Sequence, residues 1–287
     1  MSSIGITAVA ESFGRDVEAD LDRVSVLLDR ARAEGADLVV LPEATLGGYL
    51  ADMSSEDGGE LGLPPALDPE GPELSRLAEL AGSTVVCAGF CEAGEEGRYN
   101  SIACVSGDGL LGLHRKVHLP LGEGGHTTTG DSVVAFDTPV GRLGMLICYD
   151  KTFPEATREL ALDGAEIIAV SSAWPASVTD PAPRIEDDRQ TVLYDLWDRA
   201  RAAENQVVLV SANQVGPFGP LRFLGSAKVV GPGGEVLAST GPEPGLATAH
   251  IDPQAGMARA RRSMDYLRDR RPDLYPLGAD PRLARAV

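Results

Sequence analysis

Basic side chains are scarce in this sequence. Among its 287 residues, Lys and Arg number 25 against 43 Asp and Glu, which gives a formal net charge of −18 and a pI near 4.6. Such an acidic surface repels phosphate backbones and anionic lipid headgroups, so we expect neither nucleic acid nor a membrane as a partner. Long apolar runs are also lacking, because no stretch approaches the ~20 apolar residues of a membrane-spanning helix. The first residues have no basic start and no apolar run long enough for an export signal.

Cysteine is rare and follows no metal-binding pattern. The four cysteines are Cys87, Cys91, Cys104 and Cys148. They include no C-x-x-C pair, and no nearby histidine completes a zinc site. Cys87 and Cys91 lie in and beside the apolar run 84–90, so we predict that both are small core residues. This usage is typical of reduced thiols and predicts a cytoplasmic location with no structural metal.

The composition that remains is that of an ordinary globular protein. Apolar residues make up 43% and charged residues 24% of the chain. The length allows one large domain or two small ones and a sizeable core without disulfides. No Ser- or Pro-rich linker divides the chain, and no short-period repeat is present.

Strand and helix patterns alternate along the chain. Residues 15–34 carry apolar side chains at helical spacing, and Gly35 ends this helix before a buried strand at 37–41. We predict further helices at 72–81, 154–163 and 186–204, and strands at 4–10, 83–90, 100–106, 110–115, 133–136, 144–147, 165–170, 207–211, 226–230 and 236–238. Such alternation, mixed with hairpins, favours an α/β fold with a mixed sheet, or two packed sheets, and helices outside.

Three of the predicted strands end in one reactive polar residue. Strand 37–41 is followed by Glu43, strand 110–115 by Lys116, and strand 144–147 by Cys148. In α/β sheets ligands bind at the carboxyl ends of the strands, so a carboxylate, an amine and a thiol could meet there. The alternative, that each is an ordinary strand terminus, stays open on spacing alone.

The chemistry of these three side chains is complementary. Cys148 stands at a strand-to-helix junction, where a helix N-terminus lowers a thiol pKa and offers N–H groups to an oxyanion. A thiol nucleophile needs a base, and a buried glutamate could serve. A lysine could stabilise the oxyanion.

The motifs around these residues resemble those of the nitrilase superfamily of carbon–nitrogen hydrolases. The matching segments, in the family's order, are Leu41-Pro42-Glu43, Tyr99-Asn100-Ser101, Arg115 to Pro120, Ile147 to Asp150 with Phe153-Pro154-Glu155, and Arg199 to Asn205. The resemblance implies an α/β, four-layer α-β-β-α sandwich with two mixed β-sheets. It also implies a Glu-Lys-Cys triad, hydrolysis of non-peptide C–N bonds through a thioester without a cofactor, and dimers or larger assemblies.

Residue by residue, the resemblance implies the following roles. Glu43 matches the general base, Lys116 the oxyanion-stabilising lysine and Cys148 the nucleophile. Glu123 matches a second glutamate that precedes a glycine, here Gly130, by seven residues. Thr127 stands where the family usually has an aromatic residue. His118 and Asp150 are predicted to be structural.

The substrate is predicted from aromatic residues near the triad. Tyr49, Trp174 and Tyr149 are the candidates for substrate binding, and aromatic walls favour an apolar acyl group. We therefore favour a primary amide, hydrolysed to a carboxylic acid and ammonia.

Other substrates and functions stay open. A nitrile is one alternative substrate. An N-carbamoyl amino acid would need an arginine for its carboxylate. The resemblance implies that this arginine comes soon after the nucleophile, where this chain has Lys151-Thr152. An N-carbamoyl amine would need carboxylates, which Glu186-Asp187-Asp188 could supply, although that run is also typical of a helix start. The same thioester could serve an acyltransferase, and an idle, partner-binding relative is a further alternative.

The C-terminal segment differs from the rest in charge. Residues 254–271 are rich in arginine on an otherwise acidic chain. We divide the chain into a hydrolase domain at 1–252 and a C-terminal arm at 253–287 that belongs to the same domain and to a subunit interface. We therefore expect a homodimer or a higher homo-oligomer in which the arm docks on a second copy.

Overall fold

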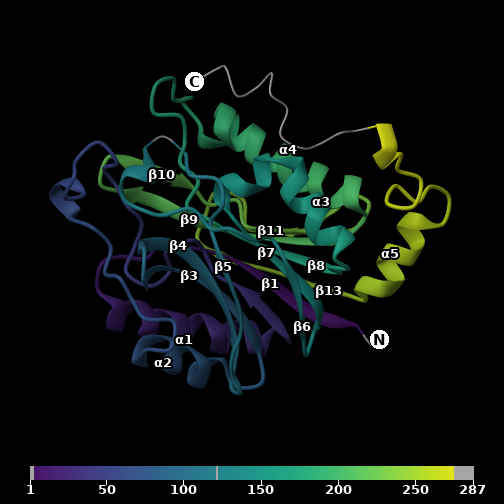
Figure 1. Ribbon diagram of the computed structural model, residues 1–287, viewed down its shortest axis with the longest axis horizontal. Helices are drawn as coiled ribbons and strands as arrows, with labels where there is room; N and C mark the ends of the chain where they lie inside the picture. The colour runs from purple at the N-terminus through teal and green to yellow at the C-terminus, as the bar shows by residue number, and fades with distance from the viewer. Residues whose placement is uncertain (1–2, 121, 275–287) are drawn as a thin grey trace.

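The computed structural model describes residues 3–120 and 122–274, and within them thirteen strands form one hydrogen-bonded sheet (Figure 1). The strands are β1 (Ile4–Glu11), β2 (Leu38–Val40), β3 (Val85–Gly94), β4 (Gly97–Ser106), β5 (Gly109–Arg115), β6 (Ala135–Thr138), β7 (Gly141–Ile147), β8 (Ile167–Ser172), β9 (Val208–Phe218), β10 (Leu221–Leu224), β11 (Lys228–Val230), β12 (Val236–Ser239) and β13 (Gly245–Ile251).

The sheet is folded over into two layers. The strand order is β5-β4-β3-β2-β1-β9-β8-β7-β6, with β13 paired to β1, β10 and β11 paired to β9, and β12 paired to β11. Parallel pairs such as β1–β2 and β7–β8 occur beside antiparallel pairs such as β3–β4 and β6–β7, so the sheet is mixed. Only two residue pairs, Ala10 with Asn213 and Glu11 with Gln214, join β1 to β9. The two predicted sheets are therefore two halves of one sheet that share this short ladder.

Helices cover both outer faces. Helices α1 (Val17–Ala33) and α2 (Pro72–Ala81) lie on one half, and α3 (Pro154–Leu162) and α4 (Arg189–Asn205) lie on the other (Figure 1). In β2, Val39 packs under α1 and α2, whereas Leu38 and Val40 point into the core between the halves. Period-two alternation in the strands thus produces the α-β-β-α sandwich that the sequence predicts.

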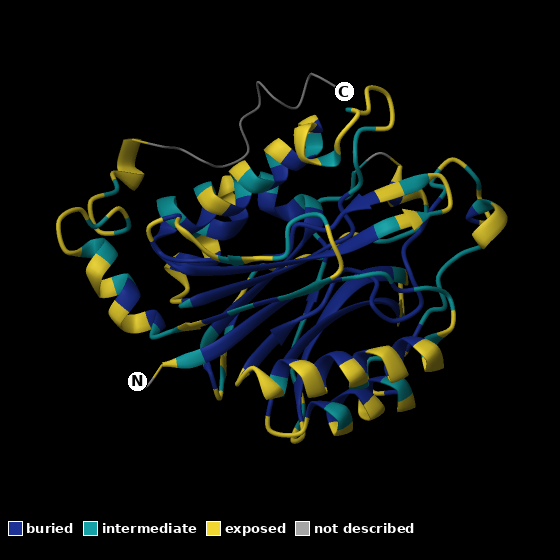
Figure 2. Ribbon diagram, turned by 180° about the vertical axis from the view of Figure 1, so that it is seen from behind, coloured by how far each residue is buried: buried dark blue, intermediate teal, exposed yellow. Residues whose placement is uncertain are grey.

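The core between the two halves is lined by strands whose residues are mostly buried, drawn in dark blue in Figure 2, and the helices outside them have exposed outer faces. Cys87 and Cys104 face each other there, on paired positions of β3 and β4, and both are fully buried. Cys91 is also buried. The prediction that Cys87 and Cys91 are core residues is confirmed.

Some elements differ from the prediction. Strands β10 and β13 are absent from it, and β3 extends to Gly94 and forms a hairpin with β4. Helix α4 begins at Arg189 rather than residue 186, because Asp188 is its N-cap and accepts the N–H of Gln190 (2.8 Å). A short 3₁₀ turn, η4 (Ile185–Asp187), precedes this cap.

The C-terminal arm packs on its own chain as far as the structure describes it. Helix α5 (Pro253–Arg261) places Met257 against the core beneath α3 and α4. The side-chain amide of Gln206 donates to the carbonyls of Ala260 (3.0 Å) and Met264 (2.8 Å). The rest of the predicted arm, 275–287, lies outside the described residues. Across 3–120 and 122–274, no helix combines the length and the apolar character needed to span a membrane.

Candidate active site

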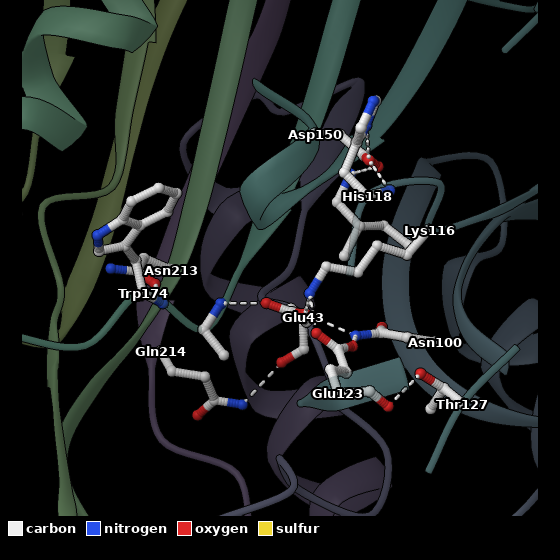
Figure 3. A network of polar contacts seen from close by, with 12 residues as sticks. Glu43, Asn100, Lys116, His118, Glu123, Thr127, Asp150, Trp174, Asn213 and Gln214 are labelled. Carbon is white, nitrogen blue, oxygen red and sulfur yellow. Dashed lines mark hydrogen bonds and ion pairs between the residues drawn. The ribbon is translucent and has the colours of Figure 1, made fainter. Parts of the chain in front are cut away.

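The three predicted strand ends meet in the interior, between the two halves of the sheet, where Figure 3 shows Glu43 beside Lys116. Glu43 follows β2, Lys116 follows β5, and Cys148 follows β7. The Lys116 Nζ lies 2.9 Å from the Glu43 Oε1, and both side chains are fully buried. The Cys148 thiol lies close enough to the Glu43 carboxylate and the Ala173 N–H for both to influence its pKa. The structure therefore brings these three predicted site residues together.

The Glu43 carboxylate is held by hydrogen bonds from three directions. Its Oε2 accepts the backbone N–H of Ala173, which follows β8 (2.7 Å). Its Oε1 accepts the Asn100 side-chain amide from β4 (2.7 Å) as well as the Lys116 ammonium. The Gln214 side chain donates to the Glu43 backbone carbonyl (3.0 Å). This network gives the carboxylate one orientation, within reach of the Cys148 thiol.

Glu123 is the second carboxylate of the site. It lies in the 3₁₀ turn η2 (Glu123–Gly125) and is buried. Its Oε2 lies 2.7 Å from the Lys116 Nζ, and its Oε1 accepts the Asn100 amide (2.6 Å). The Thr127 hydroxyl donates to the Glu123 backbone carbonyl (3.1 Å) and steadies this turn. The structure thus places Glu123 beside Glu43, with one lysine and one amide bridging the two.

Two carboxylates around one ammonium determine the charge state of the centre. Burial lowers the pKa of Lys116, but the charges of Glu123 and Glu43 outweigh burial and hold that pKa well above its ordinary value. Burial also raises the pKa of Glu123, and the negative charge of Glu43 adds to this, while Lys116 acts in the opposite direction. Lys116 is therefore a permanent cation at neutral pH.

Cys148 occupies a strained turn. It opens the 3₁₀ helix η3 (Cys148–Thr152), and its φ of 49° lies in the left-handed region, which costs a non-glycine residue on the order of 1–3 kcal/mol. Ala44, next to Glu43, has a φ of 54°. Burial raises the pKa of the Cys148 thiol well above its ordinary value, and the Glu43 charge raises it further, whereas Lys116 and the Ala173 N–H lower it. The thiol is therefore protonated at rest and lies beside a carboxylate that can accept its proton.

Asp150 joins the strand ends that carry Lys116 and Cys148. Its Oδ1 accepts the His118 N–H (2.9 Å) and contacts the His118 Nδ1 (2.9 Å). Its Oδ2 accepts the Ile147 N–H (3.1 Å) and lies 3.2 Å from the His114 Nε2. Although burial raises the pKa of Asp150, hydrogen bonds from His114 and His118 hold it below its usual range. Asp150 thus joins the strand end that carries Lys116 to the strand end that carries Cys148, and the structural role of Asp150 and His118 stays a prediction.

The three predicted substrate-binding aromatics lie in different surroundings. Tyr49 is buried close to the carboxylates, and burial followed by the Glu123 charge raises the pKa of its phenol well above the ordinary value. Tyr149 is half-buried, with its ring edge-on to Phe153 (centroids 5.1 Å apart). Trp174 follows Ala173 directly, but its indole packs on Tyr194 and Trp197.

A small cavity adjoins the second carboxylate. It measures about 30 Å³, room for one or two waters, and its walls include Tyr49, Asn100, Glu123 and Thr127. A separate cavity of about 200 Å³ lies between the loop at 176–188 and β10, and none of the predicted site residues lines it. In the described part of the chain, no group of three or more His, Cys, Asp or Glu side chains is arranged to hold a metal ion.

Sequence reasoning missed the polar residues that hold Glu43. Asn100 and Gln214 are given no role by the sequence. The same is true of Asn213, which holds the neighbouring segment because its side-chain oxygen accepts the backbone N–H of Trp174 (2.8 Å). The available signal is an amide side chain inside an otherwise apolar strand. Such a residue is buried only when it has specific partners.

Comparison with known proteins agrees with this geometry. The family model described as "Carbon-nitrogen hydrolase" matches residues 6–261. A protein named as a probable nitrilase of Schizosaccharomyces pombe is 31% identical over 91% of this chain and 92% of its own length. The N-carbamoylputrescine amidase of Arabidopsis thaliana is also 31% identical, over 91% of this chain and 90% of its own length.

Solved structures of carbon–nitrogen hydrolases and amidases are also similar to this chain. A carbon–nitrogen hydrolase from Helicobacter pylori G27 superimposes with a TM-score of 0.81 at 27% identity and covers 96% of this chain and 97% of its own. A variant of an amidase from Nesterenkonia sp. AN1, solved in complex with butyramide, has a TM-score of 0.76 at 28% identity, with 95% and 96% of the chains covered. Another variant of that amidase carries the acetamide moiety of fluoroacetamide covalently at its active-site cysteine. On its motifs, its fold and these matches, the chain is an enzyme of the carbon–nitrogen hydrolase family in the nitrilase superfamily.

Proposed function

We propose that the protein hydrolyses primary amides to a carboxylic acid and ammonia through a thioester on Cys148. The observation that carries this proposal is the meeting of a thiol, two carboxylates and a protonated lysine in one buried centre. A protonated thiol beside a fixed carboxylate can be deprotonated at the moment of attack. A fixed cation beside both can stabilise an oxyanion.

The first half-reaction forms the thioester. Glu43 removes the thiol proton as the Cys148 sulfur attacks the amide carbon, and the carbonyl oxygen becomes an oxyanion. Lys116 and the backbone N–H of Tyr149 stabilise that oxyanion. Glu43 then returns the proton to the leaving nitrogen, the C–N bond breaks, and ammonia departs.

The second half-reaction releases the acid. Glu43 takes a proton from a water molecule, whose oxygen attacks the thioester carbon. The C–S bond breaks as the second tetrahedral intermediate collapses, and the proton returns to the Cys148 sulfur. One carboxylate thus acts as base and acid in each half, which suits its fixed orientation between Ala173 and Asn100.

Glu123 supports both half-reactions without exchanging protons with the substrate. Its Oε2 holds the Lys116 ammonium at 2.7 Å, and its charge keeps that lysine protonated. Together with Asn100 it also limits how far Glu43 can move.

Several features favour an uncharged amide over the carbamoyl alternatives. The Asp188 carboxylate accepts the N–H groups of Ser177 (3.1 Å), Ala182 (3.2 Å) and Gln190 (2.8 Å), so it is occupied within its own loop. Lys151, which stands where a carboxylate-binding arginine would be useful, is buried against Asp198 (2.7 Å). The covalent acetamide and the bound butyramide of the Nesterenkonia amidase support a small aliphatic amide. Tyr49, Tyr149 and Trp174 are our proposed substrate-binding residues.

The test is ammonia release from a panel of amides, nitriles and N-carbamoyl compounds, with butyramide as the first amide. Hydroxylamine in a parallel series detects acyl transfer, because a hydroxamate would then form in place of the acid. Ammonia from the amides, with acid as the co-product, supports the proposal. Turnover confined to carbamoyl compounds would contradict the substrate assignment.

We predict that an amide is preferred to the matched nitrile by more than about tenfold in kcat/KM, or roughly 1.4 kcal/mol in transition-state binding. The site is built to stabilise a carbonyl oxyanion with Lys116, and a nitrile offers only a nitrogen at that position. The measurement is a comparison of butyramide with butyronitrile on the same preparation. A tenfold preference for the nitrile would reverse the assignment.

We also predict a homodimer whose interface includes the C-terminal arm. Met264, Tyr266 and Leu274 are exposed beside several arginines, on a chain whose net charge is negative. An apolar and basic segment on an acidic protein can pair reciprocally across a two-fold axis. The four free cysteines suit a reducing compartment, and a cytoplasmic location is therefore part of this proposal.

Light scattering at micromolar concentration tests the dimer, and Met264→Asp with Tyr266→Asp tests the arm. Val26→Asp, at an exposed position on α1, is the matched control. The arm variants should dissociate while the control stays dimeric, and salt should weaken the wild-type dimer as the Debye length falls from about 10 Å at 0.1 M to about 3 Å at 1 M. If wild type, the arm variants and the Val26→Asp control all dimerise equally strongly, the arm is not part of the interface.

A further inference from the structure

The distribution of lysine in this chain is unusual. The sequence has only three lysines, Lys116, Lys151 and Lys228, and the other 22 of its 25 Lys and Arg residues are arginines. All three lysines are buried, with 0%, 0% and 3% of their surface exposed. Lysine is almost never fully buried unless it is paired. Lys116 belongs to the catalytic centre, and the mechanism uses neither of the other two.

Lys151 and Lys228 share one buried carboxylate. The Lys151 Nζ lies 2.7 Å from the Asp198 Oδ1, and the Lys228 Nζ lies 3.0 Å from the Asp198 Oδ2. Lys228 also contacts the half-exposed Asp195 (2.9 Å). Asp198 and Asp195 come from α4, Lys228 from β11, and Lys151 from the η3 turn that begins at Cys148. The cluster therefore ties the nucleophile's turn to a helix and a strand of the scaffold.

Aromatic rings enclose the same two ammonium groups. The Lys151 Nζ lies 3.1 Å from the centroid of the Tyr194 ring, and the Lys228 Nζ lies 4.2 Å from it. Lys151 also lies 5.5 Å from the Trp174 ring, which packs on Tyr194 and Trp197. Trp174 follows Ala173, whose N–H holds Glu43. Lys151 is thus connected to both the nucleophile and the base through neighbouring residues.

The arrangement is not the one that stability alone would favour. Lys228 already pairs with Asp198, so a second buried ammonium adds a desolvation cost without a second buried carboxylate. Burial lowers the pKa of Lys151 to about 8, with Asp198 raising it and the charge of Lys228 lowering it further. Because this pKa is lower in the folded than in the unfolded state, the folded state binds fewer protons between about pH 8 and the ordinary lysine value. Stability therefore rises with pH in that window, and protonated Lys151 does not stabilise the fold.

We propose that Lys151 is a positioning residue, whose ammonium, held between Asp198 and the Tyr194 ring, fixes the turn that carries Cys148 and the Trp174 segment beside Glu43. Loss of the Lys151 proton removes the ion pair with Asp198, and the turn that carries Cys148 can then relax. The groups that face Lys151 are Asp198 and Tyr194 from α4, Lys228 from β11, Trp174 after β8, and Cys148 from its own turn. Where turnover is the readout, the proposal rests on the proposed function.

The first experiment compares Lys151→Met with Lys228→Met. Both variants leave Asp198 with one lysine partner. In the Lys151→Met variant the melting temperature should stay equal or rise, whereas alkylation of Cys148 by iodoacetamide, followed by peptide mass analysis, should slow about tenfold or more at pH 7. In the Lys228→Met variant alkylation should stay within about threefold of wild type, because the Lys151 contact remains. Alkylation needs no substrate, so this result stands whether or not the protein hydrolyses amides.

The second experiment uses pH as a readout that a purely structural role would not move. In lysine labelled with ¹³C at Cε, three side-chain signals are expected, and the two single variants assign them. The Lys151 signal should titrate near pH 8. In wild type, the rates of Cys148 alkylation and of amide turnover should each include a decrease with rising pH that has the same midpoint. The Lys151→Met variant should lack this decrease, and in the Lys228→Met variant its midpoint should move to higher pH, because the Lys228 charge that lowers the pKa of Lys151 is gone.

Two results would overturn the proposal. One is a Lys151→Met variant that folds and alkylates at the wild-type rate. The other is a titrating Lys151 signal with no matching change in Cys148 reactivity in wild type. If instead these reactivity results hold and no amide is turned over, the proposed substrate fails and the positioning role remains.

Discussion

Cys148→Ala should lower ammonia release by roughly 10⁶-fold, the scale seen when a covalent nucleophile is removed. Without the sulfur no thioester forms, and the remaining groups cannot replace it because Glu43 and Lys116 are fully buried and held by each other. The fold should survive, since alanine is smaller and takes up the same strained backbone position no less easily than cysteine. The measurement is kcat for butyramide, with circular dichroism and thermal unfolding to check the structure.

Cys87→Ala is the matched control for this prediction. Cys87 is a fully buried thiol in β3 that lies opposite Cys104 in the core. It has no role in the proposed mechanism. Its removal should cost some stability but leave kcat within a few-fold of wild type. Near-normal turnover in the Cys148 variant, or an equal loss in a folded Cys87 variant, would remove Cys148 as the nucleophile.

Glu43→Gln should reduce kcat by about 10²–10⁴-fold while substrate binding changes little, because a general base contributes on that scale. Glutamine keeps the shape of the side chain and one acceptor oxygen for the Ala173 N–H, which normally donates at 2.7 Å. It cannot take a proton from Cys148 or from water. Steady-state kinetics give kcat, and calorimetric titration with butyramide on the Cys148→Ala background gives affinity.

Glu123→Gln separates the roles of the two carboxylates. This variant removes one charge beside Lys116 but leaves Glu43 with its contacts to Asn100 and Ala173. We expect a smaller loss than for Glu43→Gln, together with a lower pKa for Lys116, because Glu123 is the larger of the two charges that raise it. A fully active Glu123→Gln variant would remove Glu123 from the site, and a Glu43→Gln variant within a few-fold of wild type would make Glu43 a structural residue.

The strands with clear local apolar patterns were predictable, and strand β13 was not. Residues 38–40 form a continuous apolar run bounded by turn signals, and this run became a buried strand. Strand β13 lacks such a run because its buried residues alternate with partly buried or exposed ones, and it forms by pairing with β1, more than 200 residues away in the chain. Contacts of that separation leave no local trace in a sequence.

The site divides in a similar way. Glu43, Lys116 and Cys148 could be located because each follows a strand and belongs to a recognisable motif. Asn100 and Gln214 could not be assigned, because their roles depend on which side chain lies opposite them across the sheet.

Local sequence was sufficient for the alternation of strands and helices, for the family and for the three strand-end residues, since each of these depends on periodicity or on a contiguous motif. Tertiary structure alone decided which groups orient Glu43, that Glu123 shares Lys116 with it, and that Lys151 and Lys228 meet at Asp198. It also decided that the described part of the C-terminal arm packs on its own chain through Gln206. The physical reason is that a buried polar group is satisfied by whatever the fold places within hydrogen-bond distance, and that distance is independent of separation along the chain.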